Sequence, residues 1–147
     1  MAAIAITVHD SYPPAETALV DGGLGASNEA AAPLHEVQPL SCFAKSESGD
    51  VLGGAIGRRW GPCCELQQLW VDPAHRHGGV ATRLIREFEA HARSRGCTSF
   101  YLETFSFQAP ALYESLGYRI AYELKVYPHG IVKFVMVKDF AEGDAKA

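Results

Sequence analysis

Residues 71–84 read VDPAHRHGGVATRL, and this stretch decides the fold. The apolar residues 66–71 predict a strand, and the amphipathic residues 79–95 predict a helix. Backbone N–H groups in the first turn of a helix have no intrahelical partner, and the helix dipole adds positive potential there. A strand, a glycine-containing turn and a helix in this order therefore predict an anion site that suits phosphate groups.

The charge of the chain limits the class of partner. The net charge is −4, so the overall field does not favour nucleic acid as a partner. Residues 75–86 differ from the rest, because they contain Arg76, Arg83 and Arg86 and no acidic residue. A local basic turn on an acidic protein suits a small polyanion.

Length and composition predict a single domain, residues 1–147, with a core at about 38–140. No apolar run reaches the roughly 20 residues that span a bilayer, and the N-terminus lacks the basic start of a signal peptide. The four cysteines show no disulfide spacing. We therefore expect a cytoplasmic protein with free thiols and no membrane partner.

Apolar runs and turn residues predict the other elements. Strands are expected at residues 4–9, 40–46, 51–59, 65–71, 98–104, 118–127 and 131–140, and helices at 15–24, 79–95 and 109–116. Residues 26–33 fit a short helix or a loop, and residues 142–147 are expected to fray. The strand after the long helix should run parallel to the strand before it. The prediction is an α/β fold: a mixed, mostly antiparallel sheet of about six to seven strands flanked by about four helices.

Two blocks of the sequence carry a resemblance to a known family. Arg76-x-x-Gly79-x-Ala81 fits the Gln/Arg-x-x-Gly-x-Gly/Ala signature of the GNAT superfamily of N-acetyltransferases, and it lies between a strand and a long helix as that signature does. Residues 109–118 read APALYESLGY, which resembles the family segment Ala-x-x-Leu-Tyr-x-x-Leu-Gly-Phe/Tyr. The chain from about residue 40 onward thus resembles a small bacterial-type GNAT domain, whereas the first 35 residues match weakly.

The resemblance implies a GNAT fold, acetyl-CoA as co-substrate and no metal. The pyrophosphate of acetyl-CoA would lie on the glycine turn, and its pantetheine arm would pair with the preceding strand, where an N–H polarises the thioester carbonyl. Ser106 stands where many family members have Asn, and its hydroxyl would contact the pantetheine. The residues implied to bind acetyl-CoA are Leu69, Trp70, Val71, Arg76, His77, Gly78, Gly79, Val80, Ala81, Thr82 and Ser106.

Tyr113 and Glu65 are the catalytic candidates. Tyr113 matches the family tyrosine that points at the CoA sulfur, so the resemblance implies a general acid, and core packing is the alternative. An alkylammonium has a pKa near 10.4, so an amine acceptor must lose a proton before it attacks. The register of Glu65 resembles the general-base glutamate of the histone-acetylating branch. Glu103 and a water chain are the alternatives for this role.

Two further features of the turn region admit two readings each. Gln67 and Gln68 put a polar side chain on each face of the predicted strand, which favours either a β-bulge or an exposed strand. His75 and His77 are expected to be solvated turn residues rather than metal ligands, because no convergent partners accompany them.

The function predicted by the resemblance is direct transfer of an acetyl group to a small-molecule or peptide amine in a ternary complex. The alternative from another class is a non-catalytic acyl-CoA-binding sensor or regulatory domain of the same fold. A third hypothesis is an unrelated α/β domain that binds another phosphate ligand. The acceptor depends on residues 14–33 and 127–130, which match no pattern, and a homodimer is common in the family.

Overall fold

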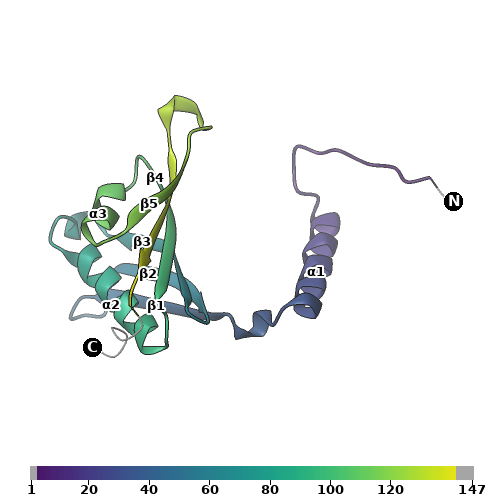
Figure 1. Cartoon of the computed structure of the whole chain (residues 1–147). Coiled ribbons are helices and arrows are strands. Elements are labelled where there is room, and N and C mark those ends of the chain that lie inside the picture. The colour runs from purple at the N-terminus through teal and green to yellow at the C-terminus, as the bar shows by residue number, and fades with distance from the viewer. Residues whose placement is uncertain (1–2, 142–147) are drawn as a thin grey trace. The chain divides into compact units, whose positions relative to one another are not determined.

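Figure 1 shows the computed structural model of the chain, which describes residues 3–141. Backbone contacts divide the chain into two compact units, Met1–Glu36 and Val37–Ala147. The first unit holds α1 (Pro14–Ala31) and a short 3₁₀ helix, Leu34–Glu36. The core expected at about residues 38–140 falls in the second unit, while a single domain for the whole chain stays a prediction. The tail expected to fray, residues 142–147, lies outside the described residues.

The second unit is built on a six-stranded sheet with the order β1-β2-β3-β4-β6-β5. The strands are β1 (Gln38–Lys45), β2 (Val51–Trp60), β3 (Cys63–Val71), β4 (Ser99–Phe105), β5 (Arg119–Leu124) and β6 (Lys133–Asp139). Neighbouring strands are antiparallel except β3 and β4, which are parallel and are joined through α2 (Val80–Ser94). With α1 and α3 (Pro110–Ser115), the described chain has three α-helices, and the predicted α/β fold is confirmed.

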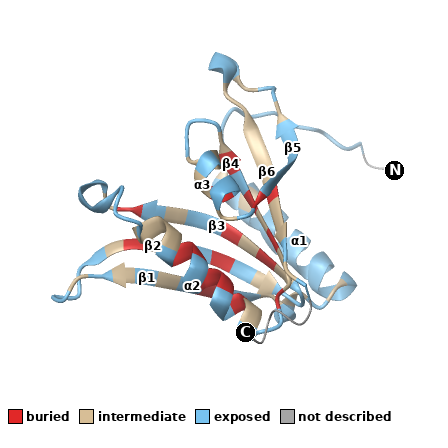
Figure 2. Cartoon of the chain, turned by 60° about the vertical axis from the view of Figure 1, so that its left-hand side comes forward, coloured by how far each residue is buried: buried red, intermediate tan, exposed pale blue. Residues whose placement is uncertain are grey.

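Helix α2 covers one face of the sheet and closes the core. Its buried stripe includes Leu84, Ile85 and Phe88, at the spacing of one helical face. Figure 2 shows buried residues on α2 and on the strands of the sheet, and α2 packs mainly against β1 and β2. A side chain at Gly57 would overlap the Glu65 carbonyl oxygen and lie 2.7 Å from the ring of Phe88, so glycine there lets the helix approach.

One charged residue, Glu89, lies on the buried face of α2 with only 5% of its surface exposed. Its carboxylate accepts hydrogen bonds from the Tyr118 hydroxyl at 2.8 Å and from Lys138 Nζ at 3.0 Å. The pKa of Tyr118 is raised, first by burial and then by the charge of Glu89. Each buried charge in this cluster therefore has a partner, as burial requires.

Replacing Lys138 with methionine is expected to lower the free energy of unfolding by about 3 kcal/mol, because Glu89 would stay buried without its cation. Urea unfolding measures this change. Lys125→Met is the matched control, since the Lys125–Glu123 pair is exposed and should contribute less than about 1 kcal/mol. Equal stability of the two variants would contradict the role given to Lys138.

The N-terminal unit differs from the prediction in two respects. Residues 4–9 form no strand, because the first unit offers no neighbouring strand, and Ile4, Ile6 and Val8 are exposed. Residues 14–31 form one continuous helix in place of a short helix followed by an undecided segment. Each glycine in this helix costs about 1 kcal/mol relative to alanine, whereas the alanines and the proline at the start favour the helix. None of the described helices is long and apolar enough to cross a membrane.

Candidate functional site

The glycine turn connects the end of β3 to the start of α2 through a short 3₁₀ helix, Pro73–His75. The Asp72 side chain accepts a hydrogen bond from the Ala74 N–H and caps this helix. Arg76 Nε donates a hydrogen bond of 2.8 Å to the carbonyl oxygen of Val71, which ties the turn to the end of β3. Gly79 has a φ of 85° and is the N-cap of α2, a conformation that favours glycine. The first-turn N–H groups of α2 are thereby directed out of the turn.

Strands β3 and β4 separate where the site begins. Their parallel pairing runs from Cys63↔Ser99 to Leu66↔Leu102, although both strands continue beyond this point. The register of β3 against β2 passes from Leu66 to Gln68 and leaves Gln67 as a bulge, which is one of the two readings of this segment, and both glutamines are also exposed. A cavity of about 900 Å³ lies beside the diverging strands. It is bounded by the second half of β3, the glycine turn, the start of α2, the end of β4 and α3.

Most of the residues expected to bind acetyl-CoA, together with Tyr113, line this cavity. They are Leu69, Trp70, Val71, Arg76, His77, Gly79, Val80, Ala81, Thr82 and Tyr113. Gly78 lies in the same turn but is not among the lining residues. The Ser106 hydroxyl accepts a hydrogen bond of 3.0 Å from the Val132 N–H, so it fastens the end of β4 to the chain before β6. Ser106 is not among the lining residues either.

Tyr113 lies on α3 and is buried between the core and the cavity. Its ring contacts the ring of Tyr118 edge-on, with centroids 5.9 Å apart. Burial raises the pKa of the Tyr113 hydroxyl to about 12, so the phenol stays protonated through the neutral range. Tyr113 therefore packs in the core and also borders the cavity, and its role as an acid stays a prediction.

Glu65 lies beside a second, smaller hollow of about 350 Å³. The two hollows share the five lining residues Leu66, Gln67, Glu103, Thr104 and Gln108. Arg58 Nε lies 2.9 Å from Glu65 Oε1, and this contact raises the pKa of Arg58. Glu103, the competing base candidate, lines both hollows, whereas Glu65 lines the second alone.

The sequence predicted no role in the site for Gln108 and Lys133, which line the second hollow. Gln108 Oε1 accepts hydrogen bonds from the Phe105 N–H at 2.7 Å and from the Thr104 hydroxyl at 3.2 Å. This fixes the amide of Gln108 at the boundary between the hollows. The sequence signal for Gln108 was a polar residue two positions before Pro110, the proline that starts α3. Lys133 had no such signal, because it reaches Glu103 only through the pairing of β4 with β6.

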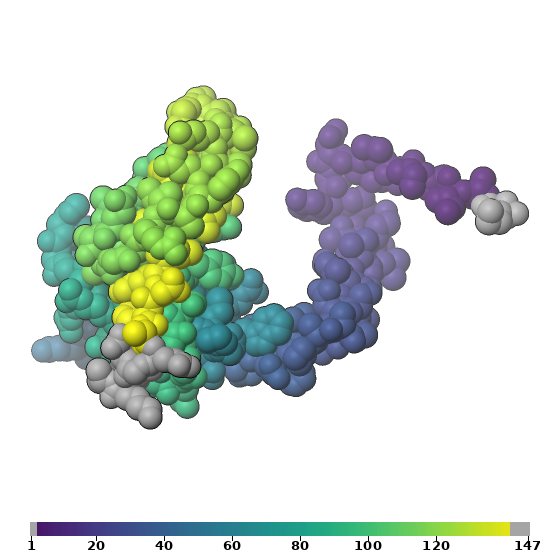
Figure 3. Space-filling view, viewed as in Figure 1, coloured from purple at the N-terminus to yellow at the C-terminus, as the bar shows by residue number. Residues whose placement is uncertain are grey.

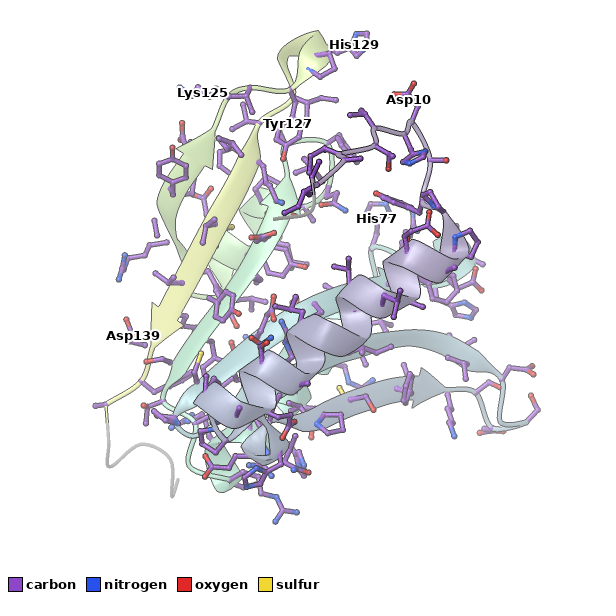
Figure 4. All side chains as sticks on the ribbon, turned by 90° about the vertical axis from the view of Figure 1, so that its right-hand side faces the viewer. Asp10, His77, Lys125, Tyr127, His129 and Asp139 are labelled. Atoms are coloured by element: carbon purple, nitrogen blue, oxygen red, sulfur yellow. The ribbon has the colours of Figure 1, made fainter. Side chains whose placement is uncertain are left out.

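The turn at residues 127–130 forms the tip of the β5–β6 hairpin. It contains a 3₁₀ helix, Pro128–Gly130, and Figure 4 shows Tyr127 and His129 at this tip, with Asp139 at the opposite end of β6. In the space-filling view of Figure 3, the hairpin protrudes from the rest of the second unit. The ring of Tyr127 meets the ring of Phe105 edge-on at 5.3 Å, which connects the tip to the second hollow.

Neither His75 nor Cys64 is placed for chemistry in the cavity. His75 Nδ1 lies 3.3 Å from the Asp72 carboxylate within the turn. Burial raises the pKa of Cys64 to about 12, so its thiol is unreactive near neutral pH. Within residues 3–141, no group of three or more histidines, cysteines and carboxylates is arranged to hold a metal ion.

The mixed sheet opens over a cavity that has a glycine turn at one side and a tyrosine-bearing helix at the other. This arrangement is that of an acetyltransferase with an α/β fold. The chain belongs to the Acetyltransferase (GNAT) family, whose model matches residues 8–118. It is an N-acetyltransferase, as the family and its relatives show.

Three similar proteins show how far the likeness extends. Blasticidin-S acetyltransferase from Streptomyces morookaense is 38% identical over 111 residues, which cover 73% of this chain and 82% of the relative. A crystal structure of an acetyltransferase from Bacillus cereus is 26% identical with a TM-score of 0.75, and the match covers 92% of this chain and 98% of that one. An aminoglycoside 6′-N-acetyltransferase crystallised with coenzyme A shares the fold at 22% identity and a TM-score of 0.59, with 69% of this chain and 72% of that chain covered.

Proposed function

We propose that this enzyme transfers the acetyl group of acetyl-CoA directly to a small-molecule amine in a ternary complex. The observation that carries the proposal is the cavity between β3 and β4, which extends from the N-terminus of α2 to Tyr113. A helix N-terminus suits the pyrophosphate, and a protonated phenol suits the thiolate that leaves. The aminoglycoside 6′-N-acetyltransferase of the same fold was crystallised with coenzyme A, which supports the choice of donor.

In this proposal the donor lies along β3. The N–H groups of residues 77–82 hold the pyrophosphate. Arg76 supports this turn through its hydrogen bond to the Val71 carbonyl oxygen. The pantetheine amides pair with the backbone of Leu69, Trp70 and Val71. Such pairing is supported by the end of the β3–β4 ladder at Leu66, beyond which β3 borders the cavity. An N–H of this segment would polarise the thioester carbonyl as charge develops on its oxygen. Gly78 belongs to the turn, and Ser106 would act through the loop that it fastens.

The chemical step needs one base and one acid. The acceptor nitrogen attacks the carbonyl carbon, the C–N bond forms, and the C–S bond breaks. The nitrogen loses a proton through water to Glu65, or to Glu103, which borders both hollows. Tyr113 donates its proton to the CoA sulfur and regains one from solvent. Both substrates are present together, so no acyl-enzyme intermediate is needed.

Release of free thiol from acetyl-CoA in the presence of an amine panel tests this function. We expect release with at least one small-molecule amine, and blasticidin S and an aminoglycoside belong in the panel because related enzymes carry those names. Thermal stabilisation by acetyl-CoA without thiol release from any amine would contradict the proposal and favour a sensor domain. No response to acetyl-CoA would favour the unrelated phosphate-binding hypothesis. A homodimer and a cytoplasmic location stay part of the proposal, the latter supported by four free thiols.

A further inference from the structure

The second hollow has a wall of mixed charge. It lies on the sheet face opposite α2, because Glu65 and Glu103 alternate along β3 and β4 with the buried residues Leu66 and Leu102. It shares Gln67, Glu103 and Gln108 with the larger cavity proposed to hold acetyl-CoA, which is called the donor cavity below. A molecule placed in the second hollow therefore lies next to the proposed site of acetyl transfer.

The strand register brings a lysine to this wall. Lys133 on β6 is paired with Phe105 of β4, which puts both side chains on the same face as Glu103. Lys133 Nζ lies 2.9 Å from Glu103 Oε2, and this hydrogen bond raises the pKa of Lys133. The ammonium also lies 5.7 Å from the centre of the Phe105 ring. The hollow therefore offers one ammonium, two carboxylates and an aromatic ring.

Lys133 puts a positive charge beside the two carboxylates of this wall, so the wall offers a partner to a carboxylate as well as to an amine. The Glu103–Lys133 pair is also open to exchange. Half of the Glu103 side chain and 28% of the Lys133 side chain are exposed, and pairs at this exposure are weak. The carboxylate of an incoming acceptor can therefore form an ion pair with Lys133, while the amine of the same molecule pairs with Glu103 or Glu65.

From this arrangement we infer that the second hollow binds the acceptor, and that the acceptor is an amine which also carries a carboxylate bound by Lys133. The inference rests on the function proposed above and adds the substrate class. Lys133 is a specificity residue in this account, and the Phe105 ring gives the acceptor body an apolar surface.

Matched pairs of amines test the inference: β-alanine with β-alaninamide, and phenylalanine with phenylalaninamide. For the wild-type enzyme we expect a KM about tenfold lower for each acid than for its amide. Lys133→Met should raise the KM of the acids about tenfold and leave the KM of the amides unchanged. Lys133→Arg should keep the preference, because arginine retains the positive charge. Lys125→Met, at an exposed ion pair on the same hairpin, is the control and should change neither value.

A merely structural lysine would raise the KM of acids and amides together, and that result overturns the inference. It is also overturned if the wild type prefers the amides, or if acetyl-CoA binds and no acid is acetylated. If the enzyme acetylates only amines that lack a carboxylate, this substrate class is overturned and the proposed function stands. If the wild-type protein does not bind acetyl-CoA, the proposed function itself is overturned.

Discussion

Replacing Gly79 with glutamate is expected to abolish acetyl-CoA binding, with a loss of affinity of at least about 100-fold. Gly79 lines the donor cavity, and a Cβ added there meets no other atom within 4 Å, so the new side chain enters the space proposed for the pyrophosphate. Its carboxylate would occupy the helix N-terminus and repel the phosphates. Titration calorimetry with acetyl-CoA measures the change.

The control for this variant must separate repulsion from backbone strain. Gly96→Glu serves, because Gly96 has a φ of 96°, also has open space around its Cα, and follows the other end of α2. Both variants should lose similar stability from a non-glycine residue at positive φ. Only Gly79→Glu should lose its affinity for acetyl-CoA. Affinity like that of the wild type in Gly79→Glu, or an equal loss in Gly96→Glu, would remove the turn from the donor site.

Tyr113→Phe is expected to lower kcat by about 100-fold and to leave acetyl-CoA affinity nearly unchanged. The phenylalanine ring keeps the edge-on contact with Tyr118, and only the hydroxyl at the cavity is lost. Steady-state kinetics and calorimetry separate the two effects. Tyr122→Phe is the control, since this tyrosine is 61% exposed on the edge strand β5. Unaltered turnover in Tyr113→Phe would exclude Tyr113 as the acid.

The raised pKa of Tyr113 also predicts how stability depends on pH. Burial favours the neutral phenol, so its pKa is about 12 in the folded protein against about 10 in an unfolded chain. The contribution of this group is complete below pH 10 and is lost as the pH rises from 10 to 12. Tyr113→Phe should show a smaller fall in unfolding free energy over this range, by up to about 2 kcal/mol. An equal fall in the variant and the wild type, measured by urea unfolding, would contradict this placement of the hydroxyl.

Local patterns predicted the parts of the structure that depend on neighbours in sequence. The bounds predicted for β1, β2, β3, β4 and α2 agree with the structure within two residues, because turn residues and hydrophobic periodicity define hairpins and amphipathic helices locally. The two glutamines in β3 indicated either a bulge or an exposed strand, because a polar residue on each face breaks the alternation, and the structure has both features. The glycine turn was predicted because glycine between a strand and a helix is a local signal, and Gly79 does have a positive φ there, as does His77 in the same turn.

Contacts between distant residues could not be predicted in this way. Glu89 and Lys138 meet because α2 and β6 pack in the core, and no local pattern specifies that register. Lys133 reaches Glu103 through strand pairing alone. The binding roles implied for Gly78 and Ser106 and the catalytic roles implied for Glu65 and Tyr113 stay predictions that the variants above test.

The early end of the β3–β4 ladder has a mechanical consequence. The sheet consists of two three-stranded halves, β1-β2-β3 and β4-β6-β5, and the strand ladder between them has four residue pairs. This seam is the shortest ladder in the sheet, and α2 packs mainly against the first half. The angle between the halves, and with it the width of the donor cavity, therefore depends on residues 63–66 and 99–102 and on the Glu89–Lys138 ion pair that joins α2 to β6. Substitutions at a part of this seam that borders neither hollow, such as the Cys64–Phe100 pair, would alter the enzyme without touching either substrate.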